Sequence, residues 1–251
     1  MMGALRDMRI RLFLILLFTI SIHAQPTKNN NFFAEVPKHE FSSVWTATEF
    51  KSLEGNEPLV RPDPLGYIGA NFQRFYIHFI SVIKDSHNPY QYFVYGKTKV
   101  KSNICTFQGI LVIEKASLYD SSDESGDRDG RISGKYLFYE NPKGSGSGYF
   151  EGRFDSEFFI GEDGLIQYNG KMMIADGFSN NLFEGNWVSY STGKPKTCNW
   201  GDFRIPNSRR LDSGASEFGP SSYFTKNGWE DFEPYWERDW SKPIDRWWIT
   251  K

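Results

Sequence analysis

The sequence predicts an all-β protein, an antiparallel meander that closes into a barrel or packs as a sandwich. Residues 150–160 carry the clearest signal, because Phe150, Phe154 and Phe158 share one parity while charged side chains occupy the other. A two-residue period is typical of a strand with one buried and one solvated face. Short polar turns follow, at 161–164 for example, and no ten-residue stretch here has a helical period.

The start of the chain predicts export. Arg6, Arg9 and Arg11 precede an apolar run over residues 12–20, and a short polar stretch ends at Ala24. This pattern is typical of a secretory signal peptide, so we expect residues 1–24 to be removed and the mature chain to be secreted or periplasmic. The alternative is a membrane anchor, but a spanning helix needs about 20 apolar residues. We expect no transmembrane segment after cleavage.

Net charge argues against one class of partner, and the two cysteines bear on disulfide formation. The chain has 29 basic and 31 acidic residues, of which the signal peptide holds three and one, so the mature chain keeps 26 and 30 and a formal charge of −4. Nucleic-acid binding requires clustered basic side chains, so we expect no nucleic-acid partner. Cys105 and Cys198 predict a disulfide in an oxidising compartment, which would stabilise the fold by about 4–5 kcal/mol. Two separate thiols are the alternative.

Further elements follow in chain order. Residues 25–43 are polar and Asn-rich, which predicts a flexible lead-in. We expect an antiparallel β domain over 44–228 that begins with a strand at 44–50, and a hairpin over 75–95. The apolar parity of its first strand consists of Phe75, Ile77, Phe79 and Ile83.

A short motif recurs in the predicted strands, an aromatic residue followed two positions later by glycine. It begins at Phe107, Phe150 and Phe183. The two residues lie on one face of a strand, so the glycine leaves room for a large ring or for tight coiling of the sheet. The last copy resembles the core of membrane occupation and recognition nexus repeats. Its Gly185 and Trp187 resemble the opening signature of lipocalins, which implies a lipocalin-like barrel, although they lie late in the chain.

The chain ends in a Trp-rich segment, residues 229–251, that holds five of the eight tryptophans. Trp229, Phe232, Trp236 and Trp240 are spaced at helical intervals. We therefore expect a short helix or an extended tail that packs on the β domain and covers an end or edge of the sheet.

Residues 120–132 form an acidic loop that resembles part of a calcium loop. When Gly130 is aligned with the turn glycine of such loops, Asp127 and Asp129 occupy two oxygen-ligand positions, and Ser125 takes the first. A solvated turn between two strands is the alternative. No other cofactor is indicated.

Aromatic residues make up 17% of the chain. Trp and Tyr offer flat surfaces with polar tips, which suit sugar rings and other amphipathic ligands, and exposed aromatic patches mark interaction sites. We therefore predict a non-enzymatic protein that binds a glycan or small amphipathic ligand through Trp187, Tyr168, Trp200 and Trp229. The alternative is that these rings fill the core.

Two other functions are open. A secreted carbohydrate-active enzyme needs two carboxylates about 5–10 Å apart, and its candidates are Glu140, Glu151, Asp155, Glu157 and Glu184. Most of them fall on a predicted solvated face, whereas a catalytic acid normally lies in a desolvated cleft. The third function is a structural module of a larger surface assembly.

Overall fold

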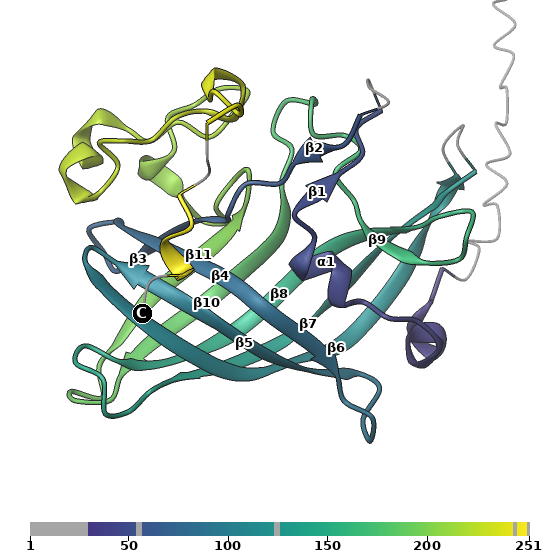
Figure 1. Cartoon of the computed structure of the whole chain (residues 1–251), viewed down its shortest axis with the longest axis horizontal. Coiled ribbons are helices and arrows are strands. Elements are labelled where there is room, and N and C mark those ends of the chain that lie inside the picture. Colours follow the sequence, from purple (N-terminus) through teal and green to yellow (C-terminus); the bar gives the residue numbers. More distant parts are fainter. Residues whose placement is uncertain (1–29, 54–56, 123–125, 243–244, 250–251) are drawn as a thin grey trace, which may run out of the picture.

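The computed structural model describes residues 30–53, 57–122, 126–242 and 245–249 (Figure 1). The predicted signal peptide, residues 25–29 of the predicted lead-in, and Ser125 of the predicted calcium loop lie outside these ranges.

Eight antiparallel strands form a closed ring. Strands β3 to β8 pair in chain order, β8 pairs with β10, and β10 pairs with β11, which returns to β3. The predicted all-β antiparallel meander is confirmed, and its arrangement is barrel-like. The strands are β3 (Leu65–Ile68), β4 (Gln73–Lys84), β5 (Gln91–Val100), β6 (Asn103–Ser122), β7 (Arg128–Glu140), β8 (Gly148–Ile160), β10 (Asn180–Ser189) and β11 (Pro195–Asp202).

Smaller elements flank the ring. Strand β9 (Ile166–Tyr168) pairs with the end of β8, and β1 (Glu49–Phe50) pairs with β2 (Leu59–Val60) in a separate two-stranded sheet. The helical elements are η1 (Phe33–Lys38), α1 (Ser42–Thr46), η2 (Arg209–Leu211), η3 (Ser222–Asn227), η4 (Tyr235–Glu237) and η5 (Trp247–Ile249). Among the described residues, no helix has the length and apolar character needed to cross a bilayer.

Aromatic side chains fill the interior of the ring. Along β8 the predicted alternation is confirmed, because Phe150, Phe154 and Phe158 are buried while Arg153 faces solvent. The largest fully buried side chains are Trp200, Tyr92, Phe41, Phe75, Phe107, Phe138, Phe150, Phe154, Phe158, Phe183, Ile77 and Leu111. The interior is therefore a packed core, as in other small barrels, and a ligand must bind outside it.

Glycine is required where the ring closes. Gly152 of β8 lies directly opposite Gly185 of β10. A Cβ atom at Gly185 would lie 2.5 Å from the hydroxyl oxygen of Tyr136 and 2.1 Å from the backbone oxygen of Glu151. The recurring aromatic and glycine motif thus makes room for a ring across the closing pair of strands.

A β-bulge in β4 changes which residues face the core. Phe79 is buried as predicted, but the pairing with β5 shifts between Phe79 and Ser81. Because the extra residue reverses the parity of the strand, Val82 is buried and Ile83 is 62% exposed. The prediction that Ile83 shares the core face is therefore wrong.

The segment before the ring packs against its end. Phe32, Val36 and Phe41 are buried, so the predicted flexible lead-in is folded wherever the structure describes it. The strand predicted over 44–50 does not begin at residue 44, because residues 42–46 form α1 and only Glu49–Phe50 is a strand. So short a helix depends on tertiary packing, which its apolar side chains supply.

Trp45 of α1 is the main anchor of this packing. Its ring meets Tyr92 and Phe154 edge-on, at centroid distances of 5.4 and 5.6 Å. Its Nε1 donates a hydrogen bond of 3.2 Å to the hydroxyl of Ser156. The helix therefore closes one end of the aromatic core.

The Trp-rich segment, yellow in Figure 1, lies above the part of the ring formed by β3, β4 and β11. It forms short 3₁₀ turns in place of one amphipathic helix. Trp229 is buried in a second apolar core, together with Tyr67, Phe72 and Phe224. This core lies on the outer face of the ring, because the neighbours of Tyr67 in β3 face inward.

Candidate ligand-binding cleft

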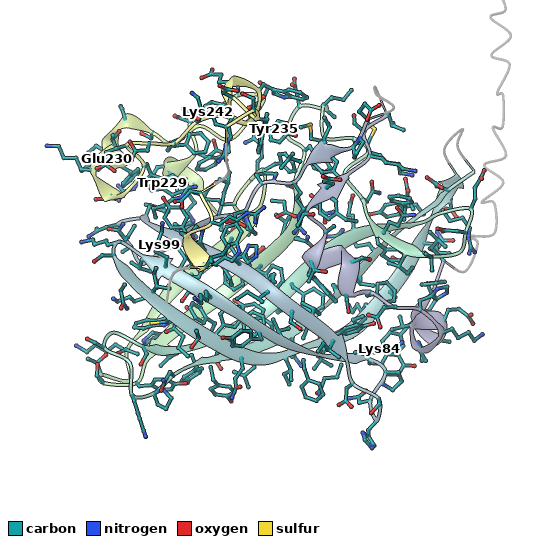
Figure 2. The ribbon with its side chains drawn as sticks, viewed as in Figure 1. Lys84, Lys99, Trp229, Glu230, Tyr235 and Lys242 are labelled. Atoms are coloured by element: carbon teal, nitrogen blue, oxygen red, sulfur yellow. The ribbon has the colours of Figure 1, made fainter. Side chains whose placement is uncertain are left out.

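A cleft of about 630 Å³ lies between the ring and the C-terminal segment. Figure 2 shows its two sides, with Lys99 on the sheet and Tyr235 on the segment above it. Nine aromatic side chains line the cleft: Tyr76, Phe178, Phe203, Phe218, Phe232, Tyr235, Trp236, Trp240 and Trp247.

The floor of the cleft is an outward-facing row on two paired strands. Arg74 and Tyr76 are two positions apart in β4, and Tyr76 lies opposite Lys99 of β5. The ammonium nitrogen of Lys99 lies 4.4 Å from the centroid of the Tyr76 ring and 5.4 Å from that of Trp247. These distances permit cation–π attraction.

Three aromatic rings enclose the guanidinium of Arg74. Its Cζ lies 4.2 Å from the centroid of Trp229, 4.9 Å from that of Tyr76 and 5.6 Å from that of Phe232. Its Nε is buried and has no hydrogen-bond partner among the described residues. Burial lowers the pKa of Arg74 from 12.5 to about 10, so the side chain stays charged at neutral pH.

Asp63 attaches the end of the chain to the sheet. Its Oδ1 lies 2.8 Å from Nδ1 of His78, and its Oδ2 accepts a hydrogen bond of 3.1 Å from Nε1 of Trp247. Trp248 stacks on the His78 ring at a centroid distance of 3.7 Å and an interplanar angle of 9°. Both carboxylate oxygens of Asp63 are therefore engaged, and Trp247 is fixed as one wall of the cleft.

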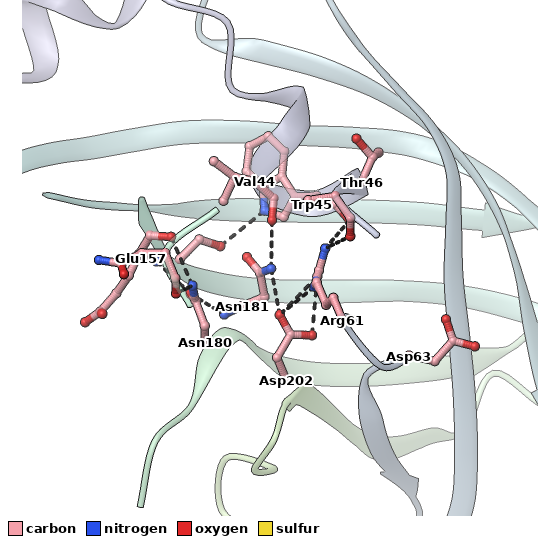
Figure 3. A network of polar contacts seen from close by, with 12 residues as sticks. Val44, Trp45, Thr46, Arg61, Asp63, Glu157, Asn180, Asn181 and Asp202 are labelled. Atoms are coloured by element: carbon pink, nitrogen blue, oxygen red, sulfur yellow. Dashed lines mark hydrogen bonds and ion pairs between the residues drawn. The ribbon is translucent and has the colours of Figure 1, made fainter. Parts of the chain in front are cut away.

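A buried ion pair holds the loop that carries Asp63 (Figure 3). Arg61 donates to both carboxylate oxygens of Asp202 and, through Nη1, to the backbone oxygens of Trp45 and Ala47 at 3.1 and 3.0 Å. The side chain of Arg61 is 5% exposed and that of Asp202 is fully buried.

Asn181 completes this network. Its Nδ2 donates to Asp202 and to the backbone oxygen of Val44, each at 2.9 Å. Burial raises the pKa of Asp202, while Arg61 opposes that shift. The network joins α1, β10, β11 and the chain leading to β3, so it positions the loop that carries Asp63.

The rim of the cleft carries exposed acidic side chains. Asp176, Asp231, Glu233 and Asp245 line the cleft and are exposed. Trp236 is 54% exposed. The cleft therefore combines a cationic floor, aromatic walls and an acidic rim.

A wider outer groove, of about 1160 Å³, runs over the sheet near Arg153 and Asp155. Two of its charged side chains are paired within the protein. Arg153 donates to Glu114 at 2.9 Å, and Asp155 accepts a hydrogen bond from Arg131. It also has fewer aromatic side chains in its lining than the cleft has, so we treat the cleft as the candidate site.

The four rings predicted to bind ligand are all buried, and none of them lines the cleft. Trp200 stacks on Phe183 in the core. Trp187 donates a hydrogen bond of 3.0 Å to the carboxylate of Glu140, and Tyr168 lies 4.5 Å beneath the guanidinium of Arg61. Because a ligand must reach a ring to stack on it, these three are structural.

Trp229 is the fourth predicted ring. It packs on Arg74 behind the cleft wall and donates a hydrogen bond of 2.8 Å to the backbone oxygen of Phe72. Other aromatic residues of the same C-terminal segment line the cleft, chiefly Tyr235, Trp236 and Trp240.

Asp127 and Asp129 face one lysine. The ammonium nitrogen of Lys171 lies 3.5 Å from a carboxylate oxygen of Asp127 and 2.6 Å from one of Asp129. The amine thus supplies the positive charge that calcium would bring. Among the described residues, no three His, Cys, Asp or Glu side chains are grouped to share a metal ion.

The predicted disulfide does not form, because Cys105 and Cys198 are both free thiols. Cys105 of β6 lies opposite Thr98, and Cys198 of β11 lies opposite Ile68. Strands β3, β4 and β5 separate the two along the ring. The disulfide was predicted from an oxidising compartment and an even number of cysteines, and neither shows where the strands that carry the two cysteines lie.

Of the five candidate catalytic acids, Asp155 and Glu184 line the outer groove, where Asp155 accepts a hydrogen bond from Arg131 and Glu184 accepts one from Asn207. Glu140 is buried and accepts hydrogen bonds from Thr98, Gly148 and Trp187, while Glu151 and Glu184 are exposed. The other two, Asp155 and Glu157, bond to Arg131 and Tyr119 on the outer face.

Sequence reasoning missed Arg74 and Lys99. The outward parity of Arg74, Tyr76 and His78 was visible in the sequence, but the segment that covers them lies more than 150 residues further on. Comparison with protein-family models, curated proteins and solved structures gave no match.

Proposed function

We propose that the protein is an exported, non-enzymatic binding protein that holds a glycan or small amphipathic ligand in the cleft. The observation that carries this proposal is the lining of nine aromatic side chains around a volume of about 630 Å³. Binding sites for small molecules commonly measure about 300–1,000 Å³ and combine apolar walls with a few polar groups.

The residues at the mouth suit such a ligand. Trp236 is 54% exposed and offers a flat face to the apolar side of a sugar ring. Tyr235 is oriented by a hydrogen bond of 3.0 Å to the backbone oxygen of Val60 and packs on Trp240. Carboxylates at the rim accept hydrogen bonds from hydroxyl groups.

A glycan array followed by calorimetric titration of the strongest hit tests this proposal. We expect Trp236→Ala to weaken binding at least about 3- to 10-fold, the range for loss of one aromatic contact. Tyr223→Ala is the matched control, since Tyr223 is 80% exposed and does not line the cleft. Unchanged affinity in Trp236→Ala, or no bound glycan or amphipathic compound at all, would contradict the proposal.

Export is the second part of the proposal and rests on the signal pattern at residues 1–24. Expression with the native start should place the protein outside the cytosol with Gln25 as its first residue. Terminal sequencing of the recovered protein checks this, and an intact start in the cytosol would refute it.

A further inference from the structure

We propose that the ligand carries a carboxylate, as an acidic sugar does, and that Arg74 and Lys99 bind it at the floor of the cleft. This inference rests on the proposed binding function and assigns a chemical class to its ligand.

Among the described residues, Arg74 and Lys99 lack the direct ion-pair or hydrogen-bond partner that other enclosed cations have. Arg61 is paired with Asp202, and Lys171 with Asp127 and Asp129. Buried charges are normally paired in this way.

Lys84 follows the same rule with a different partner. Its ammonium nitrogen donates to the backbone oxygens of Val36, Pro37 and His39 at 3.4, 2.9 and 2.6 Å. Within the described ranges, by contrast, Arg74 and Lys99 make contacts with aromatic rings but no hydrogen bond or ion pair to an acid. Both line the cleft.

The two cations lie on the floor of one cleft. The Cζ of Arg74 lies 4.9 Å and the Nζ of Lys99 4.4 Å from the centroid of Tyr76. Trp229 also contacts Arg74, and Trp247 also contacts Lys99. Guanidinium binds carboxylate with directed hydrogen bonds, and the ammonium group adds a second positive charge to the same cleft.

The acids that line the cleft form no ion pair with Arg74 or Lys99 among the described residues. Asp63 is the acid of the floor; its charge acts on Arg74 from beyond ion-pair distance, and its two oxygens are engaged by His78 and Trp247. The remaining acids lie at the rim and the walls: Asp176, Glu217, Asp231, Glu233 and Asp245. A polyanion would be repelled there, whereas sugar hydroxyls would donate hydrogen bonds to them. A sugar ring with one carboxylate fits all three parts of the cleft: the carboxylate meets the cations of the floor, the ring packs on the aromatic walls, and the hydroxyl groups donate to the acids of the rim.

The test compares acidic glycans with matched neutral forms. Oligosaccharides that contain uronic or sialic acid are screened beside their methyl esters, and sulfated analogues form a third arm. The strongest acidic hit and its ester are then titrated against the protein, Arg74→Gln, Lys99→Gln and Lys194→Gln. Lys194 is an exposed control outside the cleft.

We expect the acid to bind about 10- to 100-fold more tightly than its ester, as for a hydrogen-bonded charge. Arg74→Gln and Lys99→Gln should reduce this preference while leaving affinity for the ester within about 3-fold. Lys194→Gln should bind like the parent protein. Because Lys99 contacts two aromatic rings where Arg74 contacts three, Lys99→Gln keeps the test valid if Arg74→Gln does not fold.

Two results overturn the inference and are distinguishable from failure of the proposed function. If the acid and its ester bind equally well, and Trp236→Ala weakens the binding of both, the cleft binds glycans but does not recognise the ligand carboxylate. Preference for the sulfated form over the carboxylate also refutes it. If no glycan binds in any form, the proposed function and the inference fail together.

Discussion

Replacing Arg61 with methionine should destabilise the fold severely. The substitution keeps most of the side-chain bulk but removes the charge that neutralises Asp202. Asp202 is fully buried and would keep its hydrogen bond from Asn181 but would lose its positively charged partner. The backbone oxygens of Trp45 and Ala47 would lose their donor as well.

Removing one partner of a buried ion pair typically costs about 3–5 kcal/mol. That is a large part of the about 5–15 kcal/mol by which folded domains are stable. We therefore expect Arg61→Met to lower the free energy of unfolding by about 3–5 kcal/mol. Urea unfolding at neutral pH, followed by tryptophan fluorescence, measures this change.

An exposed ion pair supplies the control. Lys38 lies 2.8 Å from Glu35, and their side chains are 68% and 44% exposed, so Lys38→Met should cost less than about 1 kcal/mol. The double variant Arg61→Met with Asp202→Leu removes both buried charges and should be more stable than Arg61→Met alone. A loss below about 1 kcal/mol in Arg61→Met would refute the structural role of the pair.

Three further predictions concern the core and the thiols. Gly185→Ala should cost about 1–3 kcal/mol in urea unfolding, because its Cβ would collide with Tyr136 and with backbone of the facing strand. Burial raises the pKa of Glu140 in the folded state. The folded protein therefore binds this proton more tightly than the unfolded chain does, and the stabilisation is fully present below the unfolded pKa and is lost as pH rises through the folded pKa. The free energy of unfolding of the wild type, relative to that of Glu140→Gln, should therefore fall with rising pH. Cys105 and Cys198 should both react with a thiol reagent in denaturant without reductant, and slowly in the native protein, because burial raises both pKa values, that of Cys105 to about 11.

The controls for these predictions are direct. Gly219→Ala meets no atom nearer than 3.3 Å and should be better tolerated than Gly185→Ala; equal losses would contradict the packing argument. A pH-independent difference between wild type and Glu140→Gln would contradict the burial of that acid. Fewer than two reactive thiols per denatured chain would indicate the disulfide that the structure lacks.

Local patterns predicted the strands well where each one buries a single face. The alternation of Phe150, Phe154 and Phe158 follows from the geometry of a strand and needs no knowledge of its neighbours. The bulge in β4 broke the same rule at Ile83, because one extra residue reverses the faces and only pairing with β5 shows it.

Aromatic content could not show which rings lie in the core and which line the cleft. Trp200 and Trp236 have the same chemistry in the sequence, yet one is fully buried and the other is 54% exposed. The difference depends on which rings the closed sheet encloses. The same holds for Cys105 and Cys198, because a disulfide between them depends on the distance between their strands in the ring, which the sequence does not give.

By itself the sequence determined an antiparallel all-β chain with aromatic and glycine residues alternating on its strands, because these properties are set by residues two positions apart. Only the tertiary structure decided that β8 and β10 close the ring and that its interior is filled. It also placed the Trp-rich end over Arg74 and Lys99. The physical reason is that burial and charge pairing depend on contacts between segments far apart in the chain, and those contacts form the cleft.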